Sequence, residues 1–274
     1  TKSLDQKIKD DVQFSFDRVR KFAEHQLKHF NNNFEVELSP GLFAGQKLIP
    51  VNSVGCYVPG GRNNYIASAV MSITTAKVAG VKTVIAASPP KDQNGANPII
   101  IYTANLCGAD IVMNLGGVAA IGAFAYGCFG NAEVDMIVGP GNQYVAEAKR
   151  LLYGKVGIDL VAGPTEIAII ADHTADKEII ASDLVGQAEH GPNSPAWLFT
   201  NDQSLCDYVL KRVPELIADL PEHSKNNAGA AWRDYGEVIL CETNKELCQV
   251  SDQYAPEHLE VQVENLNWWK NTLR

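Results

Sequence analysis

Short apolar segments alternate with segments of helical length along most of the chain, and this alternation limits the possible fold more than any other feature. The segment KTVIAAS at 82–88 has a continuously apolar centre, which is typical of a strand covered by helices on both faces of its sheet. Repeated β-α-β units give parallel strands. The sequence therefore predicts an α/β protein with two Rossmann-like, incomplete, doubly wound half-domains, each built on a parallel sheet.

The alternation falls into two blocks, and we predict one domain for each. Residues 57–166 are expected to form one domain, and residues 1–56 together with 167–274 are expected to form the other. Before the alternation begins, apolar residues recur every three or four positions over 3–31, which predicts one long helix. A short strand or a hairpin with a turn at 39–41 is expected to follow. The strands expected from there on are 53–61, 82–88, 111–115, 134–138, 156–162, 167–170, 196–200, 237–241 and 259–262.

Composition and charge narrow the possible partners. The chain has 274 residues and a net charge of -9, which argues against nucleic acid, because binding it needs a basic surface. No apolar run approaches the roughly 18 residues of a membrane span. The six cysteines lack CxxC spacing, which predicts reduced, buried thiols in a cytoplasmic protein. The chain begins without Met and ends without a terminating feature, so we expect it to be a fragment of a longer protein.

A polar pair closes the segment GPTEIAIIADHTADKEIIASDLVGQAEHG at 163–191. A strand and then a helix are expected there, with Thr174 as the helix N-cap and Gly191 as its C-terminal stop. Gln187 and His190 are three residues apart, so one face of the helix carries both. Such a pair can bind a metal or a polar substrate. The alternative is that His190 only bonds to the last carbonyls of its helix.

Glycine-rich turns follow three of the expected strands, at 116–117, 139–142 and 162–166. In an open α/β sheet, ligands bind beyond the carboxyl ends of the strands, where backbone amides and helix N-termini favour phosphate. A nucleotide is therefore a candidate ligand, although the spacing does not match GxGxxG and no P-loop pattern occurs. The same glycines can instead serve only to make tight turns.

A second polar group occupies 255–258, with the sequence Ala-Pro-Glu-His. Pro256 prevents a helix from continuing, and a strand is expected from Leu259. Glu257 and His258 can supply a base and a second proton carrier if a turn brings their side chains together. The alternative is a solvated glutamate beside a histidine that caps a helix.

Taken together, these motifs resemble the histidinol dehydrogenase family. The matching stretches, in the family's order, are SVGCYVPGG at 53–61, LGG at 115–117, VGPGN at 138–142, EAKR at 147–150, AGPTE at 162–166, DLVGQAEHG at 183–191 and YAPEHLE at 254–260. Two longer stretches, at 146–159 and 230–241, are most similar to the sulfopropanediol dehydrogenase branch of the family.

The resemblance implies a zinc-containing, NAD-dependent enzyme that oxidises a primary alcohol through an aldehyde to a carboxylate. In this branch the substrate would be 2,3-dihydroxypropane-1-sulfonate and the product 3-sulfolactate; oxidation of histidinol to histidine is the alternative. The resemblance also implies a homodimer with a shared active site. Two other interpretations remain, a non-catalytic nucleotide-binding α/β domain and an inactive remnant of the enzyme.

The site residues that the resemblance implies carry over position by position. Gln187 and His190 match two zinc ligands, and Glu257 and His258 match the acid/base pair. Tyr57 and Asn142 match cofactor contacts, and Thr165 replaces a substrate-binding serine. The residues expected to contact the substrate are Thr165, Gln187, His190 and His258. Ala119 replaces the glutamine usual at a third cofactor contact, a change that bears on NAD affinity. The family's remaining zinc ligands, an Asp and a His, are expected beyond this chain, so we expect the chain to bind zinc weakly or not at all.

Overall fold

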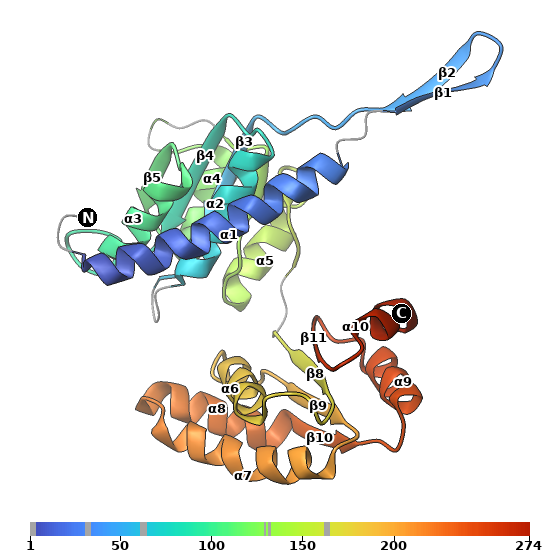
Figure 1. Ribbon diagram of the computed structural model, residues 1–274. Helices are drawn as coiled ribbons and strands as arrows, with labels where there is room; N and C mark the ends of the chain where they lie inside the picture. The colour runs from blue at the N-terminus through green and yellow to red at the C-terminus, as the bar shows by residue number, and fades with distance from the viewer. Residues whose placement is uncertain (1–3, 31–33, 61–64, 129, 131–132, 162–164) are drawn as a thin grey trace. The chain divides into compact units, whose positions relative to one another are not determined.

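The computed structural model describes residues 4–30, 34–60, 65–128, 130, 133–161 and 165–274. Contacts divide the chain into two compact units, 1–163 and 164–274, and each is described by itself (Figure 1). The division differs from the predicted domains, because residues 1–56 group with the first unit. The reason is that β3 (Ser53–Tyr57) is the middle strand of the first sheet, and α1 (Gln6–Phe30) packs against α2 (Ile66–Val78). The predicted domain division stays a prediction for the whole protein.

The first unit is built on a five-stranded sheet in which neighbouring strands are all parallel. From β3 the chain proceeds outward through β4 and β5, and then crosses to the other side of β3 through β6 and β7. This order confirms the predicted doubly wound topology, and the reversal point lies between β3 and β6. The strand order is β5-β4-β3-β6-β7, with bounds Ile111–Asn114, Thr83–Ser88, Ser53–Tyr57, Met136–Val138 and Gly157–Ile158.

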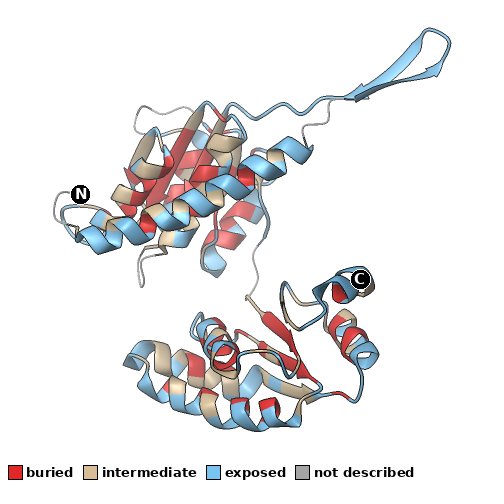
Figure 2. Ribbon diagram, viewed as in Figure 1, coloured by how far each residue is buried: buried red, intermediate tan, exposed pale blue. Residues whose placement is uncertain are grey.

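Helices cover both faces of this sheet, as its continuously apolar strands predict. Val84 and Ala86 of β4 pack among residues of one face, and Ile85 and Ala87 among those of the other, following the two-residue period of a strand. Figure 2 shows the buried residues concentrated in the strands and on the inner sides of the helices. One face carries α1, α2 and α3 (Pro98–Cys107), and the other carries α4 (Gly117–Tyr126) and α5 (Gln143–Leu152).

The predicted hairpin is formed by β1 (Phe34–Ser39) and β2 (Leu42–Gln46), which pair antiparallel. Every residue of both strands is exposed (Figure 2). Phe34 and Val36 lie on one face of the hairpin and Glu35 and Glu37 on the other, because successive side chains alternate. The hairpin therefore has an apolar face that the described residues do not cover.

The second unit is built on a four-stranded parallel sheet. One of its two inner strands, β8, is buried along its whole length, with Ile169 in the core of one face and Ile170 in the core of the other. The two parallel sheets confirm the predicted fold class. The strand order is β10-β9-β8-β11, with bounds Gly236–Leu240, Ala196–Thr200, Ile167–Ala171 and His258–Gln262. One face carries α6 (Lys177–Ala188), α7 (Gln203–Asp219) and α8 (Glu222–Tyr235), and the other carries α9 (Asn244–Tyr254) and α10 (Leu266–Thr272).

The predicted ends of the helix after β8 were wrong. Asp176, not Thr174, is the N-cap of α6, and its side chain accepts hydrogen bonds from the first amides of the helix. The Thr174 hydroxyl instead donates to Asp172 within the preceding turn, so the helix begins two residues later. At the other end Glu189 is the C-cap, and Gly191 lies beyond the helix.

All six cysteines are free, and five of them are buried. Cys128 is exposed, which differs from the prediction that all the thiols are buried. Burial raises the pKa of the Cys56 thiol to about 12, which keeps it protonated at neutral pH. Among the helices that the structure describes, none combines the length and apolar character needed to cross a membrane.

Candidate functional site

Tyr57 lies at the reversal point of the first sheet, at the carboxyl end of β3. Its hydroxyl accepts a hydrogen bond from the Gly117 amide at 3.0 Å. Gly117 opens α4, and the N-cap of this helix, Gly116, has no side chain to accept its amides. Tyr57 therefore satisfies one amide of the helix end. A tyrosine hydroxyl that accepts one hydrogen bond can also donate its proton, and Tyr57 is 5% exposed.

Asn142 lies in the turn that follows β6, the other strand at the reversal point. Its side-chain oxygen accepts hydrogen bonds from the Tyr144 and Val145 amides, both at 3.1 Å, so Asn142 is the N-cap of α5. The side chain is exposed at the same time. Asn142 thus fixes the start of a helix and remains accessible to a ligand.

These features fit a bound dinucleotide. The N-termini of α4 and α5 both lie at the carboxyl edge of the first sheet, and such helix ends favour phosphate. The turn packs tightly on the start of α5, because a Cβ atom on Gly141 would come within 2.4 Å of the Val145 side chain. Ala119 is exposed in the first turn of α4, where a glutamine would offer an amide to this edge and alanine offers none.

Gln187 and His190 lie at the end of α6 in the second unit. Gln187 is 9% exposed, and His190, just past the helix end, is exposed. The buried side-chain nitrogen of Gln187 has no hydrogen-bond partner among the described residues. Because the oxygen and nitrogen of an amide exchange places on a half-turn, this side chain can also present its oxygen.

An amide oxygen and an imidazole nitrogen are suitable zinc ligands, so Gln187 and His190 fit the metal that the family implies. Zinc in proteins usually has about four ligands. Among the described residues no group of three or more His, Cys, Asp or Glu side chains could hold a metal ion. The pair therefore accounts for two ligands of such a site.

The register of β11 turns its polar residues toward α6. His258 pairs with Ile167, and Gln262 pairs with Ala171. Both partners pack in the core that α6 helps to form, and paired residues of parallel strands point to the same face. The Gln262 side chain also donates to Asp183 of α6 at 3.4 Å. His258 therefore lies on the face of the sheet that carries α6.

Gln187, His190 and His258 lie at the same edge of that face. Helix α6 starts beyond the carboxyl end of β8 and runs back antiparallel to it, so Gln187 and His190 end near the amino edge of the sheet. His258 is the first residue of β11, one residue earlier than predicted, and lies at the amino edge as well. Ligands were expected beyond the carboxyl ends of strands, whereas these three residues lie at the opposite edge of their sheet.

The acidic character of this face extends further along β11. Glu260 lies one strand period beyond His258, and its carboxylate accepts a hydrogen bond from Gln262 at 3.2 Å. Burial, together with the nearby charge of Asp183, raises the pKa of Glu260. The face that carries His258 thus also holds two carboxyl groups, a setting that favours a cation nearby.

Glu166, directly before β8, holds the acid/base pair that was predicted from the sequence. The Nδ1 atom of His258 lies 3.0 Å from the Glu166 carbonyl oxygen. A carbonyl only accepts, so Nδ1 carries the proton and Nε2 of the neutral ring keeps its lone pair. The Glu257 amide donates to the Glu166 carboxylate at 3.2 Å. The Glu257 Oε2 and His258 Nδ1 atoms are 3.6 Å apart, so the turn does bring the two side chains together.

Sequence reasoning missed Glu166, and the available signal was its place in AGPTE beside Thr165. Thr165 is half-buried, and residues 162–164 of the predicted glycine turn lie outside the described residues. Ala255 was missed too. Its φ of 46° is the only positive φ of a non-glycine residue in the described part of the chain. It ends α9 and turns the chain toward Glu257, and such strained residues cluster at functional sites.

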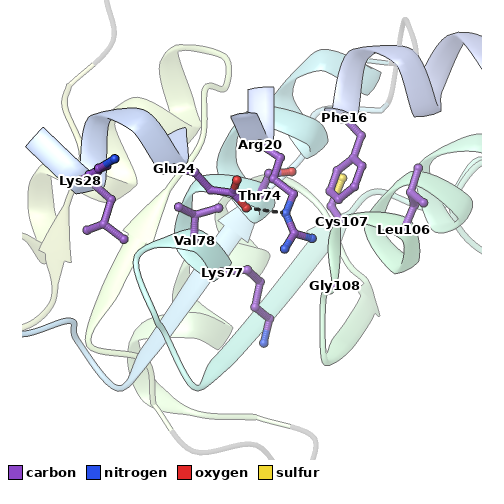
Figure 3. A pocket seen from close by; sticks show the side chains of 11 residues that line it. Phe16, Arg20, Glu24, Lys28, Thr74, Lys77, Val78, Leu106, Cys107 and Gly108 are labelled. Carbon is purple, nitrogen blue, oxygen red and sulfur yellow. Dashed lines mark hydrogen bonds and ion pairs between the residues drawn. The ribbon is translucent and has the colours of Figure 1, made fainter. Parts of the chain in front are cut away.

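The first unit also contains a groove of about 570 Å³ (Figure 3). It is formed by α1, α2 and the end of α3, and its lining includes an Arg20–Glu24 ion pair of 2.9 Å. The ends of α2 and α3 lie at the amino edge of the first sheet, opposite the edge where Tyr57 and Asn142 lie. None of the predicted site residues lines this groove.

Comparison with known proteins decides the family. The family model described as histidinol dehydrogenase matches residues 1–274. The chain belongs to the histidinol dehydrogenase family. It is therefore homologous to dehydrogenases that act on CH–OH groups with NAD, and the resemblance inferred from its motifs is confirmed. Relatives with different names match it, so the family by itself does not name a substrate.

Two curated relatives and one solved structure illustrate this. A "Histidinol dehydrogenase homolog" of Pelagibacter ubique is 71% identical over 272 residues, covering 99% of this chain and 64% of that protein. The sulfopropanediol 3-dehydrogenase of Ruegeria pomeroyi is 54% identical over 268 residues, covering 98% and 61%. The crystal structure of histidinol dehydrogenase from Elizabethkingia anophelis superposes with a TM-score of 0.91 at 32% identity, covering 99% and 61%. The chain thus spans less than two thirds of the length of each of these relatives.

Proposed function

We propose that this protein is a zinc- and NAD-dependent dehydrogenase that oxidises a primary alcohol through an aldehyde to a carboxylate. Membership of the histidinol dehydrogenase family supports the reaction class. The observation that carries the acid/base part of the proposal is the hydrogen bond between His258 Nδ1 and the Glu166 carbonyl, because it leaves Nε2 as a base.

In the proposed reaction His258 and Glu257 have separate tasks. Nε2 of His258 takes the proton of the alcohol hydroxyl as the first hydride leaves. The Glu257 carboxylate then takes a proton from the water that attacks the aldehyde carbon. The hydroxyl of Thr165 orients the substrate by a hydrogen bond. Each of the two oxidations would use its own NAD molecule, which would accept one hydride, and zinc, when bound, would supply a Lewis acid for the alcohol oxygen.

NAD would be held in the first unit by Tyr57 and Asn142, and zinc in the second unit by Gln187 and His190. Gln187 and His190 would also touch the substrate through the metal. Because these two residues account for only two of about four zinc ligands, we propose that the others come from further residues of a homodimer with a shared active site. The reduced state of the cysteines fits a cytoplasmic location.

We further propose that the substrate is 2,3-dihydroxypropane-1-sulfonate and the product 3-sulfolactate. The support is the 54% identity to the sulfopropanediol 3-dehydrogenase of Ruegeria pomeroyi, against 32% to the histidinol dehydrogenase of known structure. Histidinol is the second candidate, because the fold superposes closely on that enzyme.

The test follows NADH absorbance after either alcohol is added, with NAD and zinc, to the purified protein at its full length. We expect turnover with the sulfonate and little with histidinol. His258→Gln should lower kcat by roughly 10²- to 10⁴-fold, the usual contribution of a general base. His173→Gln, in an exposed turn outside the site, is the matched control and should leave kcat unchanged. Histidinol turnover alone would reassign the substrate, and absence of turnover with both alcohols would refute the proposal.

A further inference from the structure

The ion pair between Lys149 and Asp159 contacts the turn that carries Asn142. Lys149 of α5 pairs with Asp159, which directly follows β7. The Lys149 ammonium also donates to the Gly139 carbonyl oxygen at 3.1 Å, and the Asp159 carboxylate accepts the Gly139 amide at 2.7 Å. The pair therefore holds both polar groups of a single glycine at the start of the turn.

Gly139 needs such support because of where it lies. It follows β6 with a φ of 110°, a conformation that side chains rarely adopt. A Cβ atom on Gly139 would lie 2.1 Å from the Tyr57 carbonyl oxygen, so the turn after β6 presses directly against the end of β3. Gly139 thus sets the spacing between Tyr57 and Asn142, the two residues proposed to contact NAD.

A contribution to folding stability does not by itself account for the Lys149–Asp159 ion pair. Lys149 is 2% exposed, so its ammonium has lost nearly all of its water. Replacing a buried ion pair by apolar side chains is often neutral or stabilising, because desolvation offsets the Coulomb attraction. The pair instead fixes the orientation of the Gly139 backbone, because the Lys149 cation binds its carbonyl and the Asp159 anion binds its amide at the same time.

We propose that Lys149 and Asp159 are positioning residues for NAD: by clamping Gly139 between β3 and β6, they hold Tyr57 and Asn142 at the spacing that the dinucleotide needs. This inference rests on the proposed function. Neither residue touches the cofactor in this account. Each acts through the backbone of the turn, so weakening the clamp lowers cofactor affinity more than it slows the chemistry.

The same sheet offers a matched control pair at its other edge. Lys77 pairs with Asp110 at 2.6 Å, and the Asp110 carboxylate also accepts the Val84 amide at 2.7 Å. These residues lie where β4 and β5 begin, away from the carboxyl edge. Lys77→Met therefore removes the same kind of interaction from the same unit without touching the turn.

The experiment is done on the purified protein at its full length. NAD affinity is measured by isothermal titration calorimetry, and KM for NAD and kcat are measured by steady-state kinetics. We expect Lys149→Met and Asp159→Asn to weaken NAD binding at least about tenfold, the range seen when a group that supports a binding residue is removed. kcat at saturating NAD should change less than about twofold, because the clamp affects binding of ground and transition state alike. Lys77→Met should lower the melting temperature and leave NAD affinity unchanged.

The double variant Lys149→Met/Asp159→Asn separates positioning from stability. It should melt higher than Asp159→Asn, because no buried ammonium is left without a partner, yet its NAD affinity should stay low. Recovery of NAD affinity together with melting temperature would mean that the pair only stabilises the fold, and would overturn the inference. Single variants that bind NAD as tightly as the unaltered protein would overturn the inference as well.

An unaltered protein that binds no NAD would overturn the proposed function and this inference with it. If Asp159→Asn fails to fold by circular dichroism, Lys149→Met decides.

Discussion

Glu166 gives the sharpest test of how the acid/base pair is held. Its carboxylate accepts the Glu257 amide at 3.2 Å, longer than the 2.7–2.9 Å typical of a strong charge-assisted bond. This hydrogen bond is exposed, so water can partly replace a lost acceptor of the amide. Both facts place the contribution below the roughly 1.5–3 kcal/mol of a strong bond to a charged group, at about 1 kcal/mol, or roughly fivefold in rate.

Glu166→Leu removes that acceptor, and Glu166→Gln keeps an oxygen that can accept the same amide. We predict that Glu166→Leu slows oxidation of the aldehyde about fivefold, because Glu257 is proposed to act on the attacking water. Oxidation of the alcohol should change less, because the His258 bond goes to the backbone of Glu166 and survives both substitutions.

The assay compares NADH formation from the alcohol with NADH formation from the corresponding aldehyde for the unaltered protein and both variants. Glu166→Gln should stay within about twofold of the unaltered protein in both reactions, because the hydrogen bond is kept. Thermal melting of the variants controls for loss of fold. Equal slowing by Leu and Gln, or equal loss in the two half-reactions, would contradict the argument that Glu166 acts by holding the Glu257 backbone.

Three further predictions concern the turn, the pH dependence and the metal. Gly139→Ala should cost about 3 kcal/mol in urea unfolding through its φ and its clash with Tyr57, whereas Gly154→Ala, with a similar φ of 100° and open space around the added Cβ, should cost about 1 kcal/mol. Hydrogen bonds from Arg212 and Tyr208 lower the pKa of Glu178 to about 2 from its usual 4.5. A depressed pKa stabilises the fold above the unfolded-state value, so the melting-temperature deficit of Glu178→Gln should be complete above pH 4.5 and vanish as the pH falls toward 2. After dialysis against EDTA, the chain of 274 residues should retain well under one zinc per chain by elemental analysis, and stoichiometric zinc would contradict the two-ligand account.

The element pattern was accessible from the sequence because strand and helix signals are local. A run such as that of β8 or β4 is apolar at consecutive positions, and this pattern requires burial on both faces wherever the strand ends up. The errors were local too. Thr174 and Asp176 are both competent N-caps, and the choice between them depended on the turn bond from Thr174 to Asp172, which spacing does not reveal.

The candidate site, like the fold, was predicted only in part from the sequence. Gln187, His190, Glu257 and His258 were chosen because their residue types suit zinc and proton transfer, and the motif order identified their family. Glu166 was not chosen, because its carbonyl contacts His258 and its carboxylate contacts the Glu257 amide, and neither contact across 91 or 92 positions has a signature in the local sequence.

The chain's residues alone therefore specify which segments become strands and that helices cover them, and they indicate which side chains are candidates to bind a metal or carry a proton. They do not specify that residues 92 positions apart meet, as Glu166 and His258 do. That contact depends on the register of β11 against β8, and the contact of Gly139 with Lys149 and Asp159 depends on how β6, α5 and β7 close on one another. Register is set by packing summed over a whole sheet and both its helical layers, an energy that no single segment of sequence contains.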